Sequence, residues 1–319
     1  MSTNSKKILF LFLILIASIS FGICKGSADI PLARLFLQAN RQILYLRSAR
    51  ILLAILAGAG LSVCGTTLQA ILRNPLAEPY LLGTSSGAGL GAVLAIILGI
   101  SGIYLPFAAF AGALLSMVIV YNLAKDNKKV PVQSLILSGV IVAIALSGII
   151  VFLISISADE ALHGMMWWLL GSLQVYQLNL LFIVGGIVLF GVISIAVLSQ
   201  DLNAISLGEE EAVHLGIDIE KIKKILFVIT ALMTGAIVSV SGMIGFVGLI
   251  IPHMMRSIVG PNHKVLLPAA CLGGAAFLVL CDTISRTIFV PVEIPIGVIT
   301  SLVGAPIFMV LLKRRQKIR

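Results

Sequence analysis

Apolar residues dominate this chain in long runs, and short polar intervals separate the runs. A helix needs about 20 apolar residues to cross the hydrocarbon core of a bilayer, and shorter runs suffice where the bilayer thins or neighbouring helices shield the ends. We therefore predict ten membrane-spanning helices, at approximately residues 8–23, 51–72, 81–100, 105–123, 132–156, 178–198, 225–240, 244–259, 265–284 and 294–312.

The stretch 225–259 is nearly continuous and could form one long helix or two short helices that meet at residues 241–243. Basic residues gather in the cytoplasmic loops of membrane proteins. With two helices, both chain ends lie inside the cell together with most lysines and arginines. With one helix, the basic tail 313–319 would lie outside. We therefore predict two helices here, ten spans in all, and cytoplasmic N and C termini.

Composition agrees with a membrane protein. Hydrophobic residues make up 59% of the 319 residues and charged residues only 11%, which leaves too little polar surface to coat a soluble domain. The polar intervals are too short for a second domain, and residues 1–24 lack a small-residue cleavage pattern. We expect an all-α polytopic membrane protein, with one transmembrane domain over residues 1–319 and an uncleaved first helix.

The charged residues, cysteines and histidines indicate neither nucleic-acid binding nor a metal site. The net charge of +9 does not indicate nucleic acid, because the basic residues form short clusters between apolar runs. The four cysteines lie in or beside apolar runs without Cys-x-x-Cys spacing, as small core residues do. His253 and His263 have no carboxylate neighbours in sequence, so no metal site is predicted. His163, Trp167 and Trp168 are interpreted as a membrane-interface cluster rather than a metal or haem contact.

Gly83, Gly87 and Gly91 follow one another at four-residue spacing in the third predicted span. Small residues let helix backbones approach closely in lipid, where no hydrophobic force drives association. We predict a close helix crossing along this stripe. A chance pattern in a glycine-rich membrane protein is the alternative.

Residues 200–224 are the most informative cytoplasmic segment. Ser206 and Glu209 have capping-box spacing, and glutamates in a first turn favour the positive end of a helix dipole. Gly216 can end that helix in a left-handed conformation, and Asp218 can cap the next one. We predict two short helices outside the membrane.

Ala212, Val213 and Leu215 are predicted to share one face of these helices. Such a face would suit a cytoplasmic partner. A solvated connector is the alternative.

Two further segments contain prolines. Pro75 and Pro79, preceded by Asn74, predict a turn between the second and third spans. Pro252 is predicted to break the eighth span near its inner end and to expose carbonyl groups that Arg256 or water would satisfy.

Taken together, the segments 73–83, 200–224 and 245–263 resemble the FecCD family of permeases, which serve binding-protein-dependent ABC importers for iron-siderophores, haem and cobalamin. Residues 46–50, 59–69, 293–300 and 304–308 extend the resemblance over nearly the whole chain. One departure is Ala49, where the family usually has proline.

The resemblance implies a type II ABC importer permease fold with ATPase-coupling helices at about residues 201–222. The matching coupling residues are Ser206, Glu209, Glu210, Glu211, Ala212, Leu215 and Gly216. On the outer side, the resemblance implies that Arg47, Arg50 and Arg286 meet acidic residues of a substrate-binding protein, for which bidentate guanidinium groups are well suited. Headgroup anchoring is the alternative for each arginine.

The resemblance also implies a dimer of permease copies, expected here as a homodimer, with the translocation path along its axis. Polar residues in otherwise apolar spans are the candidates to line this path, although Ser and Thr hydroxyls often bond to their own helix. These candidates are Thr66, Thr67, Gln69, Gln133, Ser134 and Ser138.

The chain contains no Gly-Lys dipeptide and hence no phosphate-binding P-loop. We expect no catalytic residues and no cofactor in this chain, with ATP and Mg on a separate cytoplasmic ABC ATPase dimer. The predicted function is import of a metal chelate, an iron-siderophore or haem, across the inner (cytoplasmic) membrane, with cobalamin as the alternative.

Two other classes of membrane protein require residues that this sequence does not supply in the expected places. An ion-coupled secondary transporter needs an ionisable residue at mid-membrane depth, and Asp282, the nearest candidate, is predicted to pair with Arg286 four residues later. A membrane-embedded enzyme needs convergent His, Asp or Glu residues, and the sequence shows no such cluster.

Overall fold

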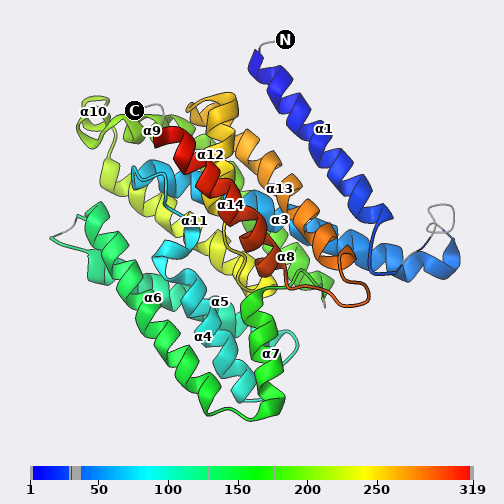
Figure 1. Ribbon diagram of the computed structural model, residues 1–319. Helices are drawn as coiled ribbons and strands as arrows, with labels where there is room; N and C mark the ends of the chain where they lie inside the picture. The colour runs from blue at the N-terminus through cyan, green and yellow to red at the C-terminus, as the bar shows by residue number, and fades with distance from the viewer. Residues whose placement is uncertain (1–2, 29, 31–36, 128, 176, 317–319) are drawn as a thin grey trace.

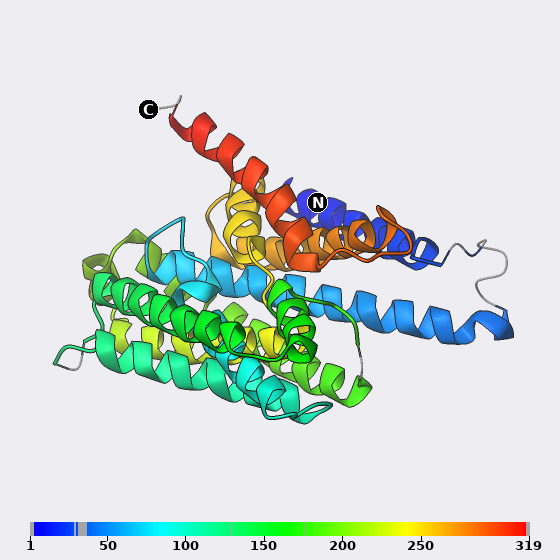
Figure 2. The same cartoon turned by 60° about the horizontal axis from the view of Figure 1, so that its bottom comes forward.

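The computed structural model describes residues 3–28, 30, 37–127, 129–175 and 177–316. Figures 1 and 2 show a bundle of packed helices. In chain order the helices are α1 (Thr3–Cys24), η1 (Gln38–Asn40), α3 (Arg41–Ile71), η2 (Pro79–Leu82), α4 (Thr84–Ile97), α5 (Tyr104–Ala124), α6 (Val132–Ser155), α7 (Asp159–Leu170), α8 (Leu178–Val197), α9 (Ser199–Leu207), α10 (Glu209–His214), α11 (Ile219–Ser241), α12 (Val247–Val259), α13 (His263–Thr287) and α14 (Ile296–Gln316).

Each of the ten predicted spans falls on one of these helices. Within the described part of the chain, seven helices are long and apolar enough to cross a membrane, and three shorter apolar helices, α4, α12 and the first part of α14, complete the set. The predicted division of residues 225–259 is confirmed, because α11 ends at Ser241 and α12 begins at Val247. Gly242, with φ of 64°, makes the turn, and a Cβ there would lie 2.2 Å from the Trp168 carbonyl oxygen.

Two helices begin earlier than their apolar runs. α3 starts at Arg41 instead of residue 51, so Arg47 and Arg50 lie on a helix. α11 starts at Ile219 instead of residue 225, so the second predicted short helix is not separate but forms the first part of α11. The predicted Asp218 cap is confirmed, since its carboxylate accepts a hydrogen bond from the Lys221 N–H at 3.1 Å. Hydropathy alone misses such starts, since polar residues continue a helix beyond the membrane.

α3 lies at the centre of the bundle and packs against α8, α11, α12 and α13. Glycines make these crossings close. A Cβ on Gly58 would lie 2.2 Å from the Gly274 carbonyl oxygen of α13, and a Cβ on Gly65 would lie 1.9 Å from the Gly248 carbonyl oxygen of α12. These two helices therefore approach α3 backbone to backbone.

The predicted crossing along the third span is confirmed. Gly87 and Gly91 of α4 face the backbone of Gly112 and Ala108 in α5, where an added Cβ would lie 2.4 Å from each carbonyl oxygen. Gly83 precedes α4 in a left-handed conformation with φ of 71°. The stripe therefore serves helix packing.

The predicted break at Pro252 is wrong. α12 continues through Pro252 to Val259. Proline removes one backbone N–H, and the carbonyl group that loses this donor belongs to Gly248, which packs against Gly65 of α3. Tertiary packing thus keeps the helix intact. Arg256, which was expected to satisfy exposed carbonyls, donates instead to the Gln69 side-chain oxygen at 3.1 Å.

The turn predicted between α3 and α4 is confirmed. The Asn74 side-chain oxygen accepts a hydrogen bond from the Leu76 N–H at 2.9 Å, and Pro79 begins the short helix η2. Tyr80 then ties this turn to the α11–α12 hinge, since its hydroxyl donates to the Ile244 carbonyl oxygen at 2.9 Å.

The two ends of the bundle gather different groups. One end holds α9, α10, the start of α1, the end of α12 and the start of α13: the Lys7 ammonium donates to the Ile258 carbonyl oxygen, and Asn203 donates to Asn262 at 3.1 Å. Both chain termini and α10 lie in the upper part of Figure 1, and α7 lies at its lower edge. The other end holds the end of α1, the start of α3 and the end of α13. We call these the α9–α10 end and the arginine end.

Candidate functional sites at the two ends of the bundle

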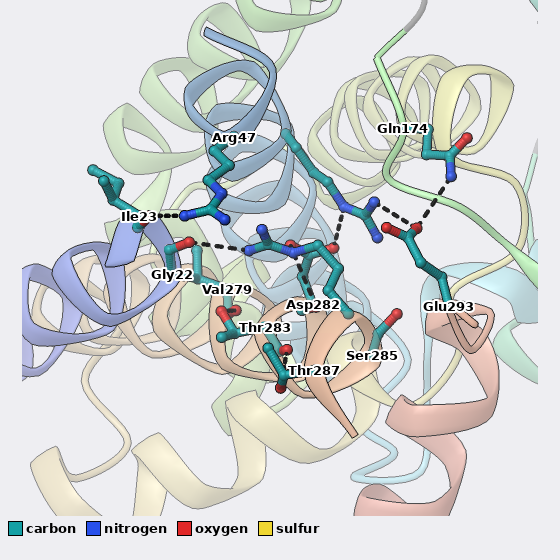
Figure 3. Close-up of polar contacts among 12 residues, drawn as sticks. Gly22, Ile23, Arg47, Gln174, Val279, Asp282, Thr283, Ser285, Thr287 and Glu293 are labelled. Atoms are coloured by element: carbon teal, nitrogen blue, oxygen red, sulfur yellow. Dashed lines mark hydrogen bonds and ion pairs between the residues drawn. The ribbon is translucent and has the colours of Figure 1, made fainter. Parts of the chain in front are cut away.

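The arginine end is built around Arg50 on α3. Its Nε lies 2.7 Å from Asp282 Oδ1 of α13, and its terminal nitrogen lies 2.8 Å from Glu293 Oε2 in the segment between α13 and α14. The two carboxylates are 232 and 243 residues away along the chain. Arg50 therefore joins the central helix to both partners, Asp282 and Glu293, which are labelled in Figure 3.

Arg286, one turn after Asp282, completes the cluster. Its Nε lies 2.9 Å from Asp282 Oδ2, so the predicted pairing of these two residues is confirmed. The N–H points less toward the carboxylate than toward the Asp282 backbone carbonyl, at 3.4 Å, and Oδ2 has no well-aligned hydrogen bond. Another Arg286 nitrogen donates to the Gly22 carbonyl oxygen of α1 at 3.3 Å. The contact with Asp282 is thus mainly one of charge.

Arg47, one turn before Arg50, closes the end of α1. Its guanidinium donates to the carbonyl oxygens of Ile23 and Ala28 at 2.8 and 2.6 Å, and lies 3.3 Å from that of Cys24. The last carbonyls of a helix lack internal partners, and a cation there is also favoured by the helix dipole. Arg47 therefore fixes the end of α1 against α3.

Glu293 lies outside the membrane-spanning helices and is held from two sides. Its Oε2 accepts hydrogen bonds from Arg50 and, at 3.1 Å, from the Gln174 amide (Figure 3). Burial alone would raise the pKa of this carboxyl, but the hydrogen bond and charge of Arg50, with the Gln174 bond, outweigh burial and lower the pKa below its usual value. Glu293 therefore stays ionised at neutral pH.

The structure brings Arg47, Arg50 and Arg286 together, but it also gives each one internal partners. Arg47 and Arg286 are 5% and 3% exposed, and the Arg50 side chain is 11% exposed. Their contact with a binding protein stays a prediction. The sequence reasoning missed Glu293 and Gln174 as their partners. The signal available was that Glu293 is one of few acidic residues in the outer segments.

Asp282 is fully buried and lies between two guanidinium groups. A gradient-coupled transporter needs an ionisable group that exchanges its ion during the cycle. A carboxylate that two arginines hold is better suited to joining α3 to α13.

At the other end, α9 and α10 meet at Gly208 to form an elbow, residues 199–216. The predicted capping box is wrong: Ser206 lies in the last turn of α9, its hydroxyl donates to the Leu202 carbonyl at 2.7 Å, and Gly208 precedes α10. The predicted short helix corresponds to α10, and α9, which was not predicted, places the serine inside a helix. Gly216, with φ of 79°, follows α10 as predicted.

The prediction that Ala212, Val213 and Leu215 share one face is also wrong. Ala212 is buried in a small core with Ala204, Ile205 and Ile219. Val213 and Leu215 point outward and are 61% and 67% exposed, as is Leu207 at 72%. The outward surface of the elbow therefore includes Leu207, Val213, Leu215 and the exposed acidic pair Glu210 and Glu211.

Glu209 differs from its two neighbours. Its carboxylate forms an ion pair with Lys223 of α11, a buried lysine whose ammonium also lies 3.6 Å from Glu220. Glu209 therefore holds the elbow to the bundle, whereas Glu210 and Glu211 face outward.

A link between the elbow and α13 was missed by the sequence reasoning. The Asn203 side-chain oxygen of α9 accepts a hydrogen bond from the His263 N–H at 2.8 Å, and it lies 2.8 Å from the His263 ring nitrogen Nδ1. Asn203 thus holds the first turn of α13. No local sequence signal marks it, because its partners lie about sixty residues away.

The six predicted path residues fall into two separate sets. Thr66 and Thr67 are buried in α3, where their hydroxyls bond to the Ser62 and Val63 carbonyls, and Gln69 donates to the Leu249 carbonyl of α12 at 3.1 Å. In the first turns of α6, which packs on α4 and α5, Gln133 is exposed, Ser134 half-buried and Ser138 buried. Their role in a path stays a prediction.

A cavity of about 680 Å³ lies beside the segment that follows α7. Trp167, Trp168, Gln174 and Ser241 are among its lining residues, and the His163 ring stacks on Trp167 with centroids 6.1 Å apart. Among the residues that the structure describes, His, Cys, Asp and Glu form no group of three that could hold a metal ion.

Comparison with known proteins gives concordant matches. The model of the FecCD transport family matches residues 10–314. The cobalamin import system permease protein BtuC of Halobacterium salinarum is 40% identical over 85% of this chain and 73% of its own. The hemin transport system permease protein HmuU of Yersinia pestis is 38% identical over 86% of this chain and 84% of its own.

One solved structure is similar over nearly its whole length. It is described as an inward-facing conformation of a metal-chelate type ABC transporter, and it aligns with a TM-score of 0.88 and 33% identity over 98% of this chain and 99% of that one.

Proposed function

The chain belongs to the FecCD transport family and is a permease subunit of an ABC importer, and on this premise we propose that its cargo is a metal chelate, either an iron-siderophore or haem. The haem importer subunit of Yersinia pestis and the metal-chelate transporter support this cargo class. Cobalamin is the alternative, because the permease of Halobacterium salinarum imports it.

Members of this family work with a separate ATPase and a binding protein. We infer that the elbow is where the ATPase docks, and the observation that carries this inference is its exposed surface. Leu207, Val213 and Leu215 are large apolar side chains on a segment that projects from the bundle, next to Glu210 and Glu211. Exposed apolar residues rimmed by charge are typical of protein interfaces. ATP and Mg then bind the ATPase, and this chain performs no chemistry.

The arginine end is the proposed docking site of the binding protein. Three arginines gather there, and Arg50 and Arg286 contact the carboxylates of Asp282 and Glu293. The Arg50 side chain is 11% exposed, and a guanidinium group at the surface would attract an acidic surface. In this proposal Arg50 makes the direct contact, and Arg47 and Arg286 hold the surface around it in shape.

The proposed assembly contains two identical permease copies in the inner membrane, with N and C termini in the cytoplasm. The path runs between the copies, and Thr66, Thr67, Gln69, Gln133, Ser134 and Ser138 are its candidate lining residues. Since the hydroxyls of Thr66 and Thr67 already have backbone acceptors, a rotation of α3 or its neighbours would be needed before they met cargo.

Co-purification tests the elbow. Glu210→Lys combined with Glu211→Lys reverses two exposed charges and leaves the Glu209–Lys223 ion pair in place. We expect the purified permease to lose most of its ATPase subunit. The matched control is Asp159→Lys with Glu160→Lys, an exposed acidic pair at the start of α7. Full ATPase recovery with the elbow variant, or equal loss with the control, would refute this docking site.

Cargo is tested with proteoliposomes that contain the permease, its ATPase and the binding protein. Uptake of a ferric siderophore, haem or cobalamin should require ATP on the side of the membrane on which the elbow and the ATPase lie. Uptake driven by an ion gradient without ATP would overturn the proposed mechanism.

A further inference from the structure

A groove of about 590 Å³ lies between α1 and α13 at the α9–α10 end of the bundle. Both helices begin at this end. From α1 it is lined by Asn4, Ser5, Ile8, Leu9 and Phe12, and from α13 by Lys264, Val265, Pro268 and Leu272. The α1 residues share one side of that helix, since they recur at helical spacing.

The lining changes from polar to apolar in the same direction on both helices. Asn4, Ser5 and Lys264 lie in the first turn of each helix, and the apolar residues follow up to Phe12 and Leu272. At a rise of 1.5 Å per residue, each wall is about 12 Å long. A polar entrance and an apolar interior match a molecule with a polar head and a hydrocarbon tail.

The entrance is positively charged. Lys264 lines the entrance and is exposed, whereas Lys6 and Lys7 lie in the first turns of α1 on other sides of that helix, where Lys7 donates to the Ile258 carbonyl at the end of α12. Residues 1–24 contain no Asp or Glu, and none lines the groove among the described residues. An anion entering here therefore meets the Lys264 ammonium group and, among the described lining residues, no carboxylate.

The backbone N–H groups in the first turn of α13 are not available to bind the anion. The N–H groups of His263 and Lys264 bond to the side chains of Asn203 and Asn262, and those of Val265 and Leu266 bond to the Asn262 carbonyl. These N–H groups therefore already have hydrogen-bond acceptors, and the Lys264 ammonium group must attract the anion.

From this arrangement we propose that the groove binds one anionic phospholipid of the inner leaflet. Its phosphate lies beside Lys264 at the polar entrance, and one acyl chain lies along Ile8, Leu9 and Phe12 of α1. Basic pockets between transmembrane helices on the cytoplasmic side favour anionic headgroups in this way. Free phosphate would leave the apolar walls unused, and a neutral lipid would leave Lys264 unpaired. The bound lipid joins α1 to α13.

Native mass spectrometry of the full permease tests this. Delipidated protein is mixed with equal amounts of phosphatidylglycerol and phosphatidylcholine that carry the same acyl chains. We expect one phosphatidylglycerol per chain to be retained in preference. Lys264→Gln should reduce the preference about five-fold, since each lysine near an anionic surface contributes a factor of that size. Inorganic phosphate added alone should not displace the lipid.

The matched control is Lys125→Gln with Lys129→Gln, two exposed lysines in the segment between α5 and α6. It should retain the lipid, whereas Leu9→Trp, which fills the groove from an exposed position, should release it. Equal retention of the two lipids by the parent, equal loss in the control, or displacement by phosphate alone would overturn the proposal.

Discussion

Replacement of Asp282 by Asn removes one charge from the arginine end and keeps the shape of the side chain. In the parent, Asp282 faces Arg50 at 2.7 Å and Arg286 at 2.9 Å and is fully buried. In the variant, Arg50 keeps Glu293, but buried Arg286 keeps only backbone carbonyls, among them Gly22 at 3.3 Å. Among the described residues, Arg50 and Arg286 are then left with one carboxylate, that of Glu293, in place of two.

The magnitude follows from Arg286. A buried ion pair that loses one partner destabilises a protein by about 3–5 kcal/mol, because the remaining charge is buried without compensation. That is a large share of a typical folding stability of roughly 5–15 kcal/mol. For a chain of 319 residues, with about 2.1 cal/mol/K of unfolding entropy per residue, each kcal/mol shifts the Tm by about 1.5 °C, so we expect the Tm to fall by roughly 4–8 °C.

The assay is thermal unfolding of the purified permease in one detergent, followed by size-exclusion chromatography after heating. The control is Glu160→Gln, which neutralises an exposed carboxylate at the start of α7 and should change the free energy of unfolding by no more than about 0.5 kcal/mol. Asp282→Asn with Arg286→Gln should recover part of the loss, because the uncompensated charge is gone. An unchanged Tm for Asp282→Asn, or a double variant as unstable as the sum of the single variants, would refute the reasoning.

Three further predictions concern other parts of the fold. Because the pKa of Glu293 is lowered, its ion pair contributes its full stability above the ordinary glutamate pKa of about 4.3, and this contribution is lost as the pH falls below that value. On acidification the Tm of Glu293→Gln should therefore fall less than the Tm of the parent. Parallel curves of Tm against pH would contradict this. Gly65→Ala would push a methyl group against the Gly248 carbonyl, so the yield of monodisperse permease should fall, whereas Gly186→Ala, which meets no atom within 4 Å, should not change it. Asn203→Ala removes the acceptor of the His263 N–H, so it should lower the free energy of unfolding by about 1–3 kcal/mol and reduce ATP hydrolysis by the complex. Gln200→Ala, at an exposed position of the same helix, should change neither.

The helices could be predicted from the sequence because the bilayer imposes one simple condition, a long apolar run whose backbone bonds internally. Even the turn at Gly242 could be predicted, since the charge of the flanking loops decided between one helix and two. The extension of α3 back to Arg41 could not be, because hydropathy ends where the membrane ends and the helix does not.

The sites were less predictable because their partners are distant in sequence. The three arginines were expected at a surface, but Arg50 meets carboxylates more than 200 residues later, and only the folded bundle brings them together. At the elbow, Ser206 fits a capping pattern locally, yet α9 extends through it and Gly208 precedes the next helix. Packing decides which of two such local patterns forms, and here the burial of Ala212 and Ile205 favours the helix that continues through Ser206.

The side of the membrane on which the elbow lies tests the whole account most directly. Val213→Cys introduces a thiol at an exposed position of the elbow, and Glu160→Cys introduces one at the opposite end, with the unsubstituted chain as the blank. A membrane-impermeant maleimide should label the Glu160→Cys variant in intact cells and the Val213→Cys variant only in inverted vesicles, where the bound ATPase should protect it. Labelling of the Val213→Cys variant from outside intact cells would contradict the orientation, the ATPase attachment and the direction of transport together.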